Sequence, residues 1–393
     1  MNYLAIVVFI LAGPVSACCM VPRDYPGDVD QSAQRVVVVH RAPDGDTPGY
    51  QEMIIRVQPF FQGSETNPTT MTWVVTVPSK PLRYDQASVE ALDAGPEFQK
   101  KLFQLARDQW ANKTGFEWPE WLSWMSARDA SVNDAKAAGA IEEDALVTVG
   151  PYNITPVRAK GAEAVQALND YLGQRGFPKE DPAHLQYFID NEFTFLCINV
   201  TPQQGQTALG RELELPPLVI GFETPEPYYP GKFSSRQGNF KLDLTVITDS
   251  PLNTQSVGEL RKRMNAKNYG YVQLVNLFSV QALPETLTSA LSERVTTREK
   301  QRWYVNRIES EGFNDASEGG IAAWETDVFF KVGTIHDEIP GFWYYGDQEI
   351  SWYERLVREH AMAFFVTMGM LFFLSLYIKV RINRKRAAAE KAA

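Results

Sequence analysis

Cysteine and histidine are scarce in this sequence, with three cysteines and four histidines among 393 residues. No HExxH or CxxC motif occurs, and no two histidines have the spacing of zinc ligands. Phosphate-binding loops of the GxxxxGK[ST] and GxGxxG types are absent, as are the GxSxG elbow and the SxxK motif of serine enzymes. The sequence therefore predicts no cofactor and no metal, and it identifies no catalytic residue.

Positive charge is also in short supply. The chain has 38 Lys and Arg against 48 Asp and Glu, a formal net charge of −10. The tail at residues 379–393 holds six basic side chains and one acidic one, so residues 1–378 sum to −15. Proteins that bind nucleic acid or anionic headgroups gather Lys and Arg on the binding face. We therefore expect no nucleic-acid partner.

Two groups of residues have the chemistry of a site, and the sequence favours a structural role for each. Asp44 and Asp46 flank one glycine, but this spacing is not that of an EF-hand calcium loop, so solvated turn acids are favoured. Cys197 and His184 are candidates for a thiol–imidazole pair. Cys197, however, lies within the apolar run at 193–198, where a buried or bridged cysteine is more ordinary.

The N-terminus has the features of a cleaved signal peptide. An apolar run at residues 3–12 is too short to cross a bilayer, and the Val-Ser-Ala at 15–17 has the small residues that a signal peptidase needs. Because a charged leader is missing, a buried N-terminal strand is the alternative. With Cys18, the same residues resemble a bacterial lipobox, in which this cysteine is acylated. We expect removal of residues 1–17 and leave lipidation of Cys18 open.

The C-terminal region predicts one membrane anchor. Residues 361–378 are eighteen residues without a charge, and as a helix they would span about 27 Å, close to the thickness of the hydrocarbon core. The positive-inside rule places the basic tail in the cytoplasm. We expect a single-pass protein of the cell membrane, with its N-terminal domain extracytoplasmic and its C-terminus cytoplasmic. A tail-anchored protein without a signal peptide is the alternative.

Export permits disulfides, because exported proteins fold in an oxidising compartment. If Cys18 is acylated, Cys19 and Cys197 remain as an even pair, and otherwise one thiol is left over. A disulfide between Cys19 and Cys197 is therefore possible. The sequence does not show whether their Cα atoms approach within about 7 Å, which a disulfide requires.

The spacing of apolar residues predicts an α+β fold with mostly antiparallel sheet, helical insertions and one C-terminal transmembrane helix. Strands are predicted at 35–40, 51–59 and 71–77 as one meander, at 145–159 with a break at Gly150-Pro151, at 192–200, and as a pair at 218–222 and 241–248. Helices are predicted at 98–110, 162–172 and 181–190. The pattern weakens beyond residue 250.

The predicted organisation has five parts, with an uncertain boundary near residue 250. They are a signal peptide at 1–17, an α+β extracytoplasmic domain at 18–250, a second extracytoplasmic region at 251–350, a juxtamembrane and transmembrane helix at 351–378, and a basic cytoplasmic tail at 379–393. More than three hundred residues outside the membrane are enough to bury a core without a disulfide framework.

Tryptophan is concentrated in the segment WPEWLSW. Trp118, Trp121 and Trp124 recur at every third residue, roughly along one face of a helix. Such a row is a candidate binding platform on which sugar rings or a partner could stack. Rings that cover the core beneath a loop are the favoured alternative, because aromatic side chains bury large areas.

Several short sequences follow one another in a characteristic order. They are Asp30-Gln31-Ser32-Ala33-Gln34 before a strand, Trp73-Val74-Val75-Thr76-Val77-Pro78, Val149-Gly150-Pro151-Tyr152, Gly176-Phe177, and Leu215-Pro216-Pro217-Leu218 leading on to Tyr229-Pro230. Together they resemble a bacterial family of exported proteins catalogued as domain of unknown function 2330. The resemblance covers residues 18–248. It implies an exported domain, often with a C-terminal membrane segment, and it implies no activity.

Two functions fit these observations. The first is a non-enzymatic binding or envelope-assembly module, displayed on a membrane anchor, with an envelope protein or glycan as its partner. The second is an extracytoplasmic hydrolase that acts on envelope glycans or peptides. A deep cleft with paired buried carboxylates would favour the hydrolase, and a flat exposed apolar patch would favour the binding module.

Overall fold

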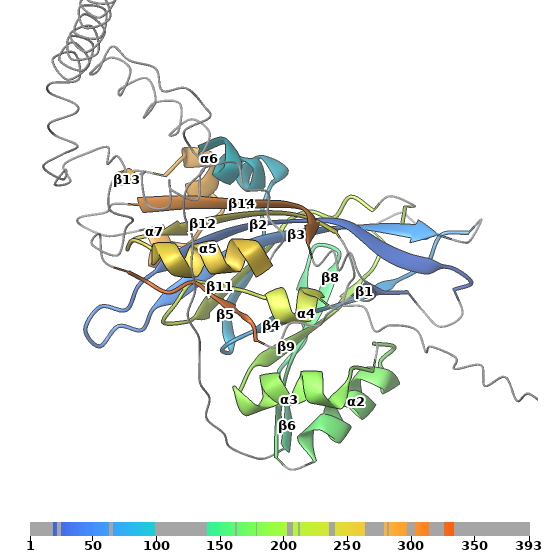
Figure 1. The fold of residues 1–393 in the computed structure, drawn as a ribbon. Coiled ribbons are helices and arrows are strands. Elements are labelled where there is room, and N and C mark those ends of the chain that lie inside the picture. Colours follow the sequence, from blue (N-terminus) through green and yellow to red (C-terminus); the bar gives the residue numbers. More distant parts are fainter. Residues whose placement is uncertain are drawn as a thin grey trace, which may run out of the picture.

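A computed structural model of the chain contains two stacked β-sheets with helices on both outer faces (Figure 1). It describes residues 19–21, 25–62, 66–98, 140–161, 163–177, 179–202, 207–210, 213–235, 240–263, 279–280, 283–296, 303–313 and 326–333. The strands are β1 (Cys19–Met20), β2 (Asp28–Arg41), β3 (Tyr50–Gln62), β4 (Met71–Val77), β5 (Pro81–Gln86), β6 (Ala140–Glu143), β7 (Val147–Val149), β8 (Tyr152–Lys160), β9 (Thr194–Val200), β10 (Leu218–Glu223), β11 (Tyr228–Tyr229), β12 (Phe240–Thr248), β13 (Ser279–Val280), β14 (Trp303–Phe313) and β15 (Val328–Phe329). The helices are α2 (Ala164–Gln174), α3 (Pro182–Asp190), α4 (Gly231–Ser234), α5 (Thr254–Arg263), α6 (Glu285–Thr288) and α7 (Glu293–Thr296), together with a helix at 89–98.

The seven-stranded sheet has the order β13-β14-β12-β2-β3-β10-β5. Its centre is the long antiparallel pair of β2 and β3. Successive side chains of a strand point to opposite faces, and β3 carries buried apolar side chains on both. Met53, Ile55 and Val57 join the core between the two sheets, whereas Tyr50 and Ile54 join a second core beneath helices. The strand is therefore buried on both sides.

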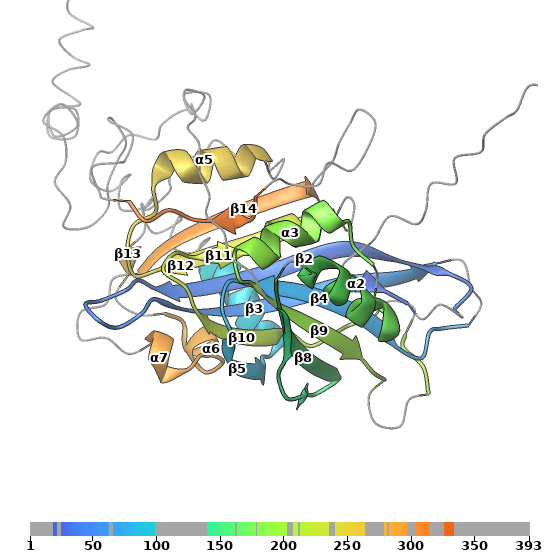
Figure 2. The ribbon, with the colours of Figure 1, turned by 90° about the horizontal axis from the view of Figure 1, so that it is seen from below.

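The six-stranded sheet has the order β1-β4-β9-β8-β6, with β7 also paired to β8, and every pairing is antiparallel. Helices α2 and α3 lie over its outer face (Figure 2). Leu168, Leu172, Leu185 and Phe188 on these helices are fully buried. Helix α3 begins where the Asp181 carboxylate accepts hydrogen bonds from the first free backbone amides.

The outer face of the seven-stranded sheet is covered by the helix at 89–98 and by α6 and α7 (Figure 1). The helix at 89–98 packs so closely that a Cβ on Gly95 would lie 2.8 Å from Val37 Cγ2. Its first turn is capped by Ser88, whose hydroxyl accepts from the Ala91 amide at 3.2 Å. The sequence predicted a helix that opens only at residues 96–97, so this first part was missed.

An α+β fold with mostly antiparallel sheet is confirmed, and so are the helices predicted at 162–172 and 181–190. One pairing differs, because β12 runs parallel to β2. Two predicted arrangements of strands are wrong. β4 leaves the expected meander and joins the other sheet, where β1 and β9 flank it. β10 and β12 do not pair with each other, since β3 and β2 lie between them.

The sheet continues past residue 250. β12 precedes this position, and its partner β14 follows it. Leu252, Val257 and Phe313 also belong to the core between the sheets. Strands on both sides of the predicted boundary therefore share one sheet and one core.

The predicted membrane segments lie outside the described residues. This holds for the signal peptide at 1–17, the helix at 351–378 and the tail at 379–393. Within the part of the chain that the structure describes, no helix is both long enough and apolar enough to cross a membrane. The topology therefore stays a prediction.

Candidate functional site

Most residues that the sequence singled out for binding or modification lie outside the described ranges. These are Cys18, Trp118, Trp121 and Trp124. The acids Asp44 and Asp46 are described, and they sit in a tight turn in which the Asp44 and Thr47 backbones exchange two hydrogen bonds of 3.0 Å. No group of three or more potential metal ligands occurs among the described residues. Lipidation of Cys18 and the tryptophan platform stay predictions.

The possible disulfide between Cys19 and Cys197 is not formed. Cys19 lies opposite Trp73 on the neighbouring strand β4, and Cys197 on β9 lies opposite Val74. Directly opposed residues share a face of a sheet, while adjacent residues of one strand point to opposite faces. The two thiols therefore point to opposite sides of the sheet, with β4 between them, so a bridge would require the strand register to change.

We expect the purified protein to run identically on reducing and non-reducing gels, because the strand register separates the two thiols. The matched comparison is the Cys197→Ser variant, which should migrate like the parent under both conditions. A shift on non-reducing gels that disappears in Cys197→Ser would contradict the register.

Cys197 does not have the environment of a nucleophile. It is 1 % exposed, and burial raises the pKa of its thiol to about 12. The thiolate is the reactive form, so this thiol stays protonated and inert at neutral pH. His184 lies among aromatic rings, with centroids 5.4 Å from Phe188 and 5.5 Å from Phe233. The favoured structural role of Cys197 agrees with these surroundings.

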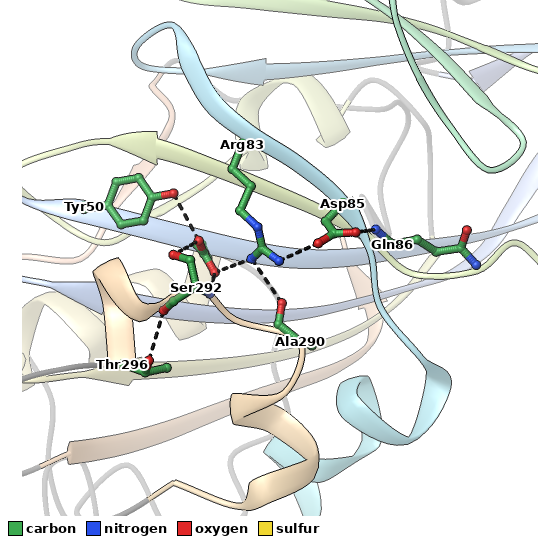
Figure 3. Close-up of polar contacts among 8 residues, drawn as sticks. Tyr50, Arg83, Asp85, Gln86, Ala290, Ser292 and Thr296 are labelled. Atoms are coloured by element: carbon green, nitrogen blue, oxygen red, sulfur yellow. Dashed lines mark hydrogen bonds and ion pairs between the residues drawn. The ribbon is translucent and has the colours of Figure 1, made fainter.

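The most enclosed ionic cluster in the described part of the chain surrounds Glu52 on β3 (Figure 3). The Glu52 side chain is 0 % exposed. Its carboxylate accepts from Tyr50 Oη at 3.1 Å, Arg83 Nη1 at 2.8 Å and the Ser292 amide at 2.8 Å, and also from the Ser292 hydroxyl. We call Glu52, Tyr50, Arg83 and Ser292 the Glu52 clamp.

The clamp ties distant parts of the chain together. Arg83 on the edge strand β5 also donates from Nη1 to the Ala290 carbonyl at 3.1 Å and from Nη2 to Asp85 Oδ2 at 2.6 Å. Ser292 lies between α6 and α7. One buried carboxylate on the central β3 strand therefore anchors both the edge strand and the helical segment 283–296.

A carboxylate has about four lone-pair positions, and the clamp supplies four donor contacts to Glu52. Burial, together with the charge of Glu52, raises the pKa of Tyr50, so its phenol stays protonated. Neither group has an open position toward a substrate. The geometry around Glu52 and Tyr50 therefore fits a structural role better than that of a general acid or base.

A second buried cluster fixes the last described segment, residues 326–333, which we call the C-terminal strap. Asp327 Oδ2 accepts from Tyr228 Oη at 2.7 Å, and Oδ1 accepts from the amides of Lys232 at 2.9 Å and Val328 at 3.0 Å. Burial raises the pKa of Asp327 to about 6 despite these hydrogen bonds. Both of its oxygens therefore accept hydrogen bonds from within the fold.

The strap is held along its whole length. Its strand β15 pairs with β11, and Leu252 bridges Val332 beside α5. The Tyr187 hydroxyl on α3 accepts from the Asp327 amide at 2.9 Å. Because the predicted anchor follows in the sequence, this strap is the described element nearest to it along the chain.

Sequence reasoning missed both clusters. Alternation along β3 placed Met53, Ile55 and Val57 on one face, which leaves Glu52 on the other. Nothing local indicates that Ser292, 240 positions away, completes its shell. The contact depends on the tertiary fold, and the available signal was an acidic residue within a largely buried strand.

The protein is a sheet-rich α+β protein with two stacked sheets. Its buried charged residues form hydrogen bonds and ion pairs that hold segments of the fold together. The chain belongs to a family of uncharacterized proteins conserved in bacteria, DUF2330, whose model matches residues 28–313. The match confirms the resemblance seen in the sequence and extends it beyond residue 248. No curated protein matches the chain.

Three solved structures of one viral protein show a weak structural likeness. They are baculovirus P35 (TM-score 0.34, 8 % identity, 77 % of this chain and 97 % of that chain), a mutated baculovirus P35 after caspase cleavage (0.33, 8 %, 76 % and 97 %) and the caspase-8/P35 complex (0.30, 9 %, 76 % and 96 %). TM-scores of this size do not establish a common fold. Nothing about function follows from them.

Proposed function

We propose that this chain is a non-enzymatic binding or assembly module of the bacterial cell envelope, displayed outside the membrane by a C-terminal anchor. The signal peptide at 1–17, the apolar span at 361–378 and the basic tail support this topology. The acidic remainder of the chain favours partners other than nucleic acid or anionic lipid. The partner would be an envelope protein or a glycan.

One observation carries the non-enzymatic role. The most buried carboxylate in the described part of the chain, Glu52, has all its acceptor positions occupied by the protein itself. Two further buried groups of reactive types are also not free to react, because Asp327 accepts hydrogen bonds from internal donors and burial keeps the Cys197 thiol protonated. A hydrolase needs at least one such group poised toward substrate. The described clusters instead connect distant segments of the fold to one another, which suits a scaffold that presents a surface.

The direct test is an affinity pull-down of the tagged full-length protein from gently solubilised, cross-linked membranes. The control is the isolated anchor, residues 340–393, exported by its own signal. We expect partners that are captured by the full chain and not by the anchor. If nothing specific is captured and the purified protein degrades an envelope glycan or peptide, the binding role is wrong and the hydrolase is correct.

A further inference from the structure

Arg56 on β3 is a buried cation without a counter-ion. The residue is 6 % exposed, and its Nε has no hydrogen-bond partner. Its guanidinium forms no ion pair or hydrogen bond within the part of the chain that the structure describes. Removing a charge from water without pairing it is strongly unfavourable, so a buried arginine in this state indicates a missing anion.

Other arginines on the same face of the seven-stranded sheet are paired. Arg35 contacts Asp93 and lies 4.0 Å from Asp243. Arg307 donates to both carboxylate oxygens of Asp243 at 2.8 and 3.1 Å. Arg83 has its carboxylate in the Glu52 clamp. The lack of a partner at Arg56 is therefore not a general property of this face.

The strand register explains why no carboxylate reaches Arg56. Arg56 lies opposite Arg35 on β2, Arg35 lies opposite Asp243 on β12, and Asp243 lies opposite Glu309 on β14. Directly opposed residues share a face, so the four side chains form one row across the sheet. Positive charge gathers at the β3–β2 end of the row, and negative charge gathers at the β12–β14 end.

The chain that covers Arg56 carries two acids, and neither forms an ion pair with Arg56: Asp93 is bonded to Arg35, and Glu90 is exposed. Leu218, the first residue of β10, lies opposite Ile55, so the preceding Pro217 comes next to Arg56; its carbonyl accepts from the Ala87 amide at 2.9 Å. On the β2 side, Arg56 is flanked by Arg35, which is bonded to Asp93. The segment from Ala87 to Asp93 therefore crosses above Arg56. It contains the N-terminus of the helix at 89–98, whose partial positive charge also favours an anion there.

The neighbouring phenol does not supply the missing charge. Tyr152 is close enough for the positive charge of Arg56 to act on its pKa, but burial outweighs this effect and raises that pKa. The Tyr152 hydroxyl donates to the Pro216 carbonyl. Tyr152 therefore stays neutral at physiological pH and supplies no negative charge to Arg56.

We propose that Arg56 binds an oxyanion, the phosphate or carboxylate group of a small ligand, next to Pro217 and the start of the helix at 89–98. A guanidinium presents two parallel N–H donors that match two oxygens of either group. The site stands apart from the proposed export topology and envelope role, because none of its residues lies in the predicted signal or anchor.

The test is the thermal unfolding of the purified full-length protein in detergent, in chloride, phosphate and acetate buffers of matched pH and ionic strength. We expect phosphate or acetate to raise the Tm by several degrees over chloride, by an amount that grows with the logarithm of concentration. A response to phosphate alone identifies a phosphoryl ligand, and a response to acetate alone identifies a carboxylate. No difference between the three anions would overturn the proposal.

Two variants test whether the increase in Tm caused by the anion depends on Arg56. Arg56→Met keeps the apolar stem and removes the charge, so it should fold at least as stably as the parent in chloride and lose the anion response. Arg175→Gln removes an exposed arginine paired with Glu143 and should retain the full response. A response that persists in Arg56→Met would overturn the site. Should that variant not fold, Arg56→Lys should weaken the anion Kd about tenfold, because it loses the two-pronged donor, and an unchanged Kd would contradict the proposal.

Discussion

Replacing Glu52 by Gln is expected to lower the free energy of unfolding by about 3 kcal/mol. Removing one partner of a buried ion pair costs about 3–5 kcal/mol, and the lower end applies because the Arg83 side chain is 23 % exposed. The amide would also direct N–H donors at Arg83 or the Ser292 amide, which are donors themselves. Urea denaturation of the parent and the variant at pH 7 measures the difference.

The matched control is Glu143→Gln, which breaks an ion pair with Arg175 in which both side chains are 42 % exposed. Exposed pairs contribute about 0–1 kcal/mol, so this variant should unfold nearly as the parent does. Hydrogen exchange adds a local readout. The amide of Ser292 should lose protection in Glu52→Gln, because its acceptor changes. Equal stability of the two variants would show that the clamp does not fasten the segment 283–296.

Replacing Asp327 by Asn is expected to stabilise the protein progressively as the pH rises from about 4 to 6. The pKa of Asp327 is about 6 in the folded protein, against an ordinary value of 3.8 for an aspartate side chain. Between these values the folded state holds a proton that the unfolded state has lost, so the parent loses stability as the pH rises. The total is about 3 kcal/mol at 1.36 kcal/mol per pKa unit. Below pH 4 the parent and Asp327→Asn should unfold alike.

The parent alone should not show this slope, because His40 acts in the opposite direction. Burial lowers the pKa of His40 to about 4 from 6.5, so the unfolded state binds a proton first and stability falls as the pH drops from 6.5 to 4. The two contributions largely cancel between pH 4 and 6. Urea denaturation across pH 4–8 should therefore show that these two groups leave the free energy of unfolding of the parent nearly independent of pH. In Asp327→Asn, the free energy of unfolding should fall steeply as the pH is lowered. If the free energy of unfolding depended on pH in the same way in the parent and in Asp327→Asn, the raised pKa of Asp327 would be contradicted.

Much of the fold could be predicted from the sequence, because strand and helix periodicities are local. The alternation in β3 and the β-branched run in β2 identified the central pair of strands. The break at Gly150-Pro151 separated β7 from β8, which pair across that turn. Gly150 has a φ of +54°, a conformation that favours glycine, so the sequence carried a direct signal for the turn.

The errors arose where long-range packing decided the outcome. Every residue of β4 is buried, and such a strand fits equally well into either of two stacked sheets, so its sheet could not be predicted. The parallel pairing of β12 with β2 joins segments about two hundred residues apart. The candidate site shows the same limit, since Glu52 and Arg56 look like ordinary polar positions until the structure reveals which one has a partner.

The proposed envelope role requires an ectodomain displayed on the outer face of the membrane. Protease added to intact spheroplasts that express the full chain with a C-terminal tag tests this directly. We predict that the ectodomain is degraded, while a short tagged fragment containing the span and the basic tail survives until the membrane is permeabilised. Full protection of the chain in intact spheroplasts would contradict the proposed topology, and the envelope role with it.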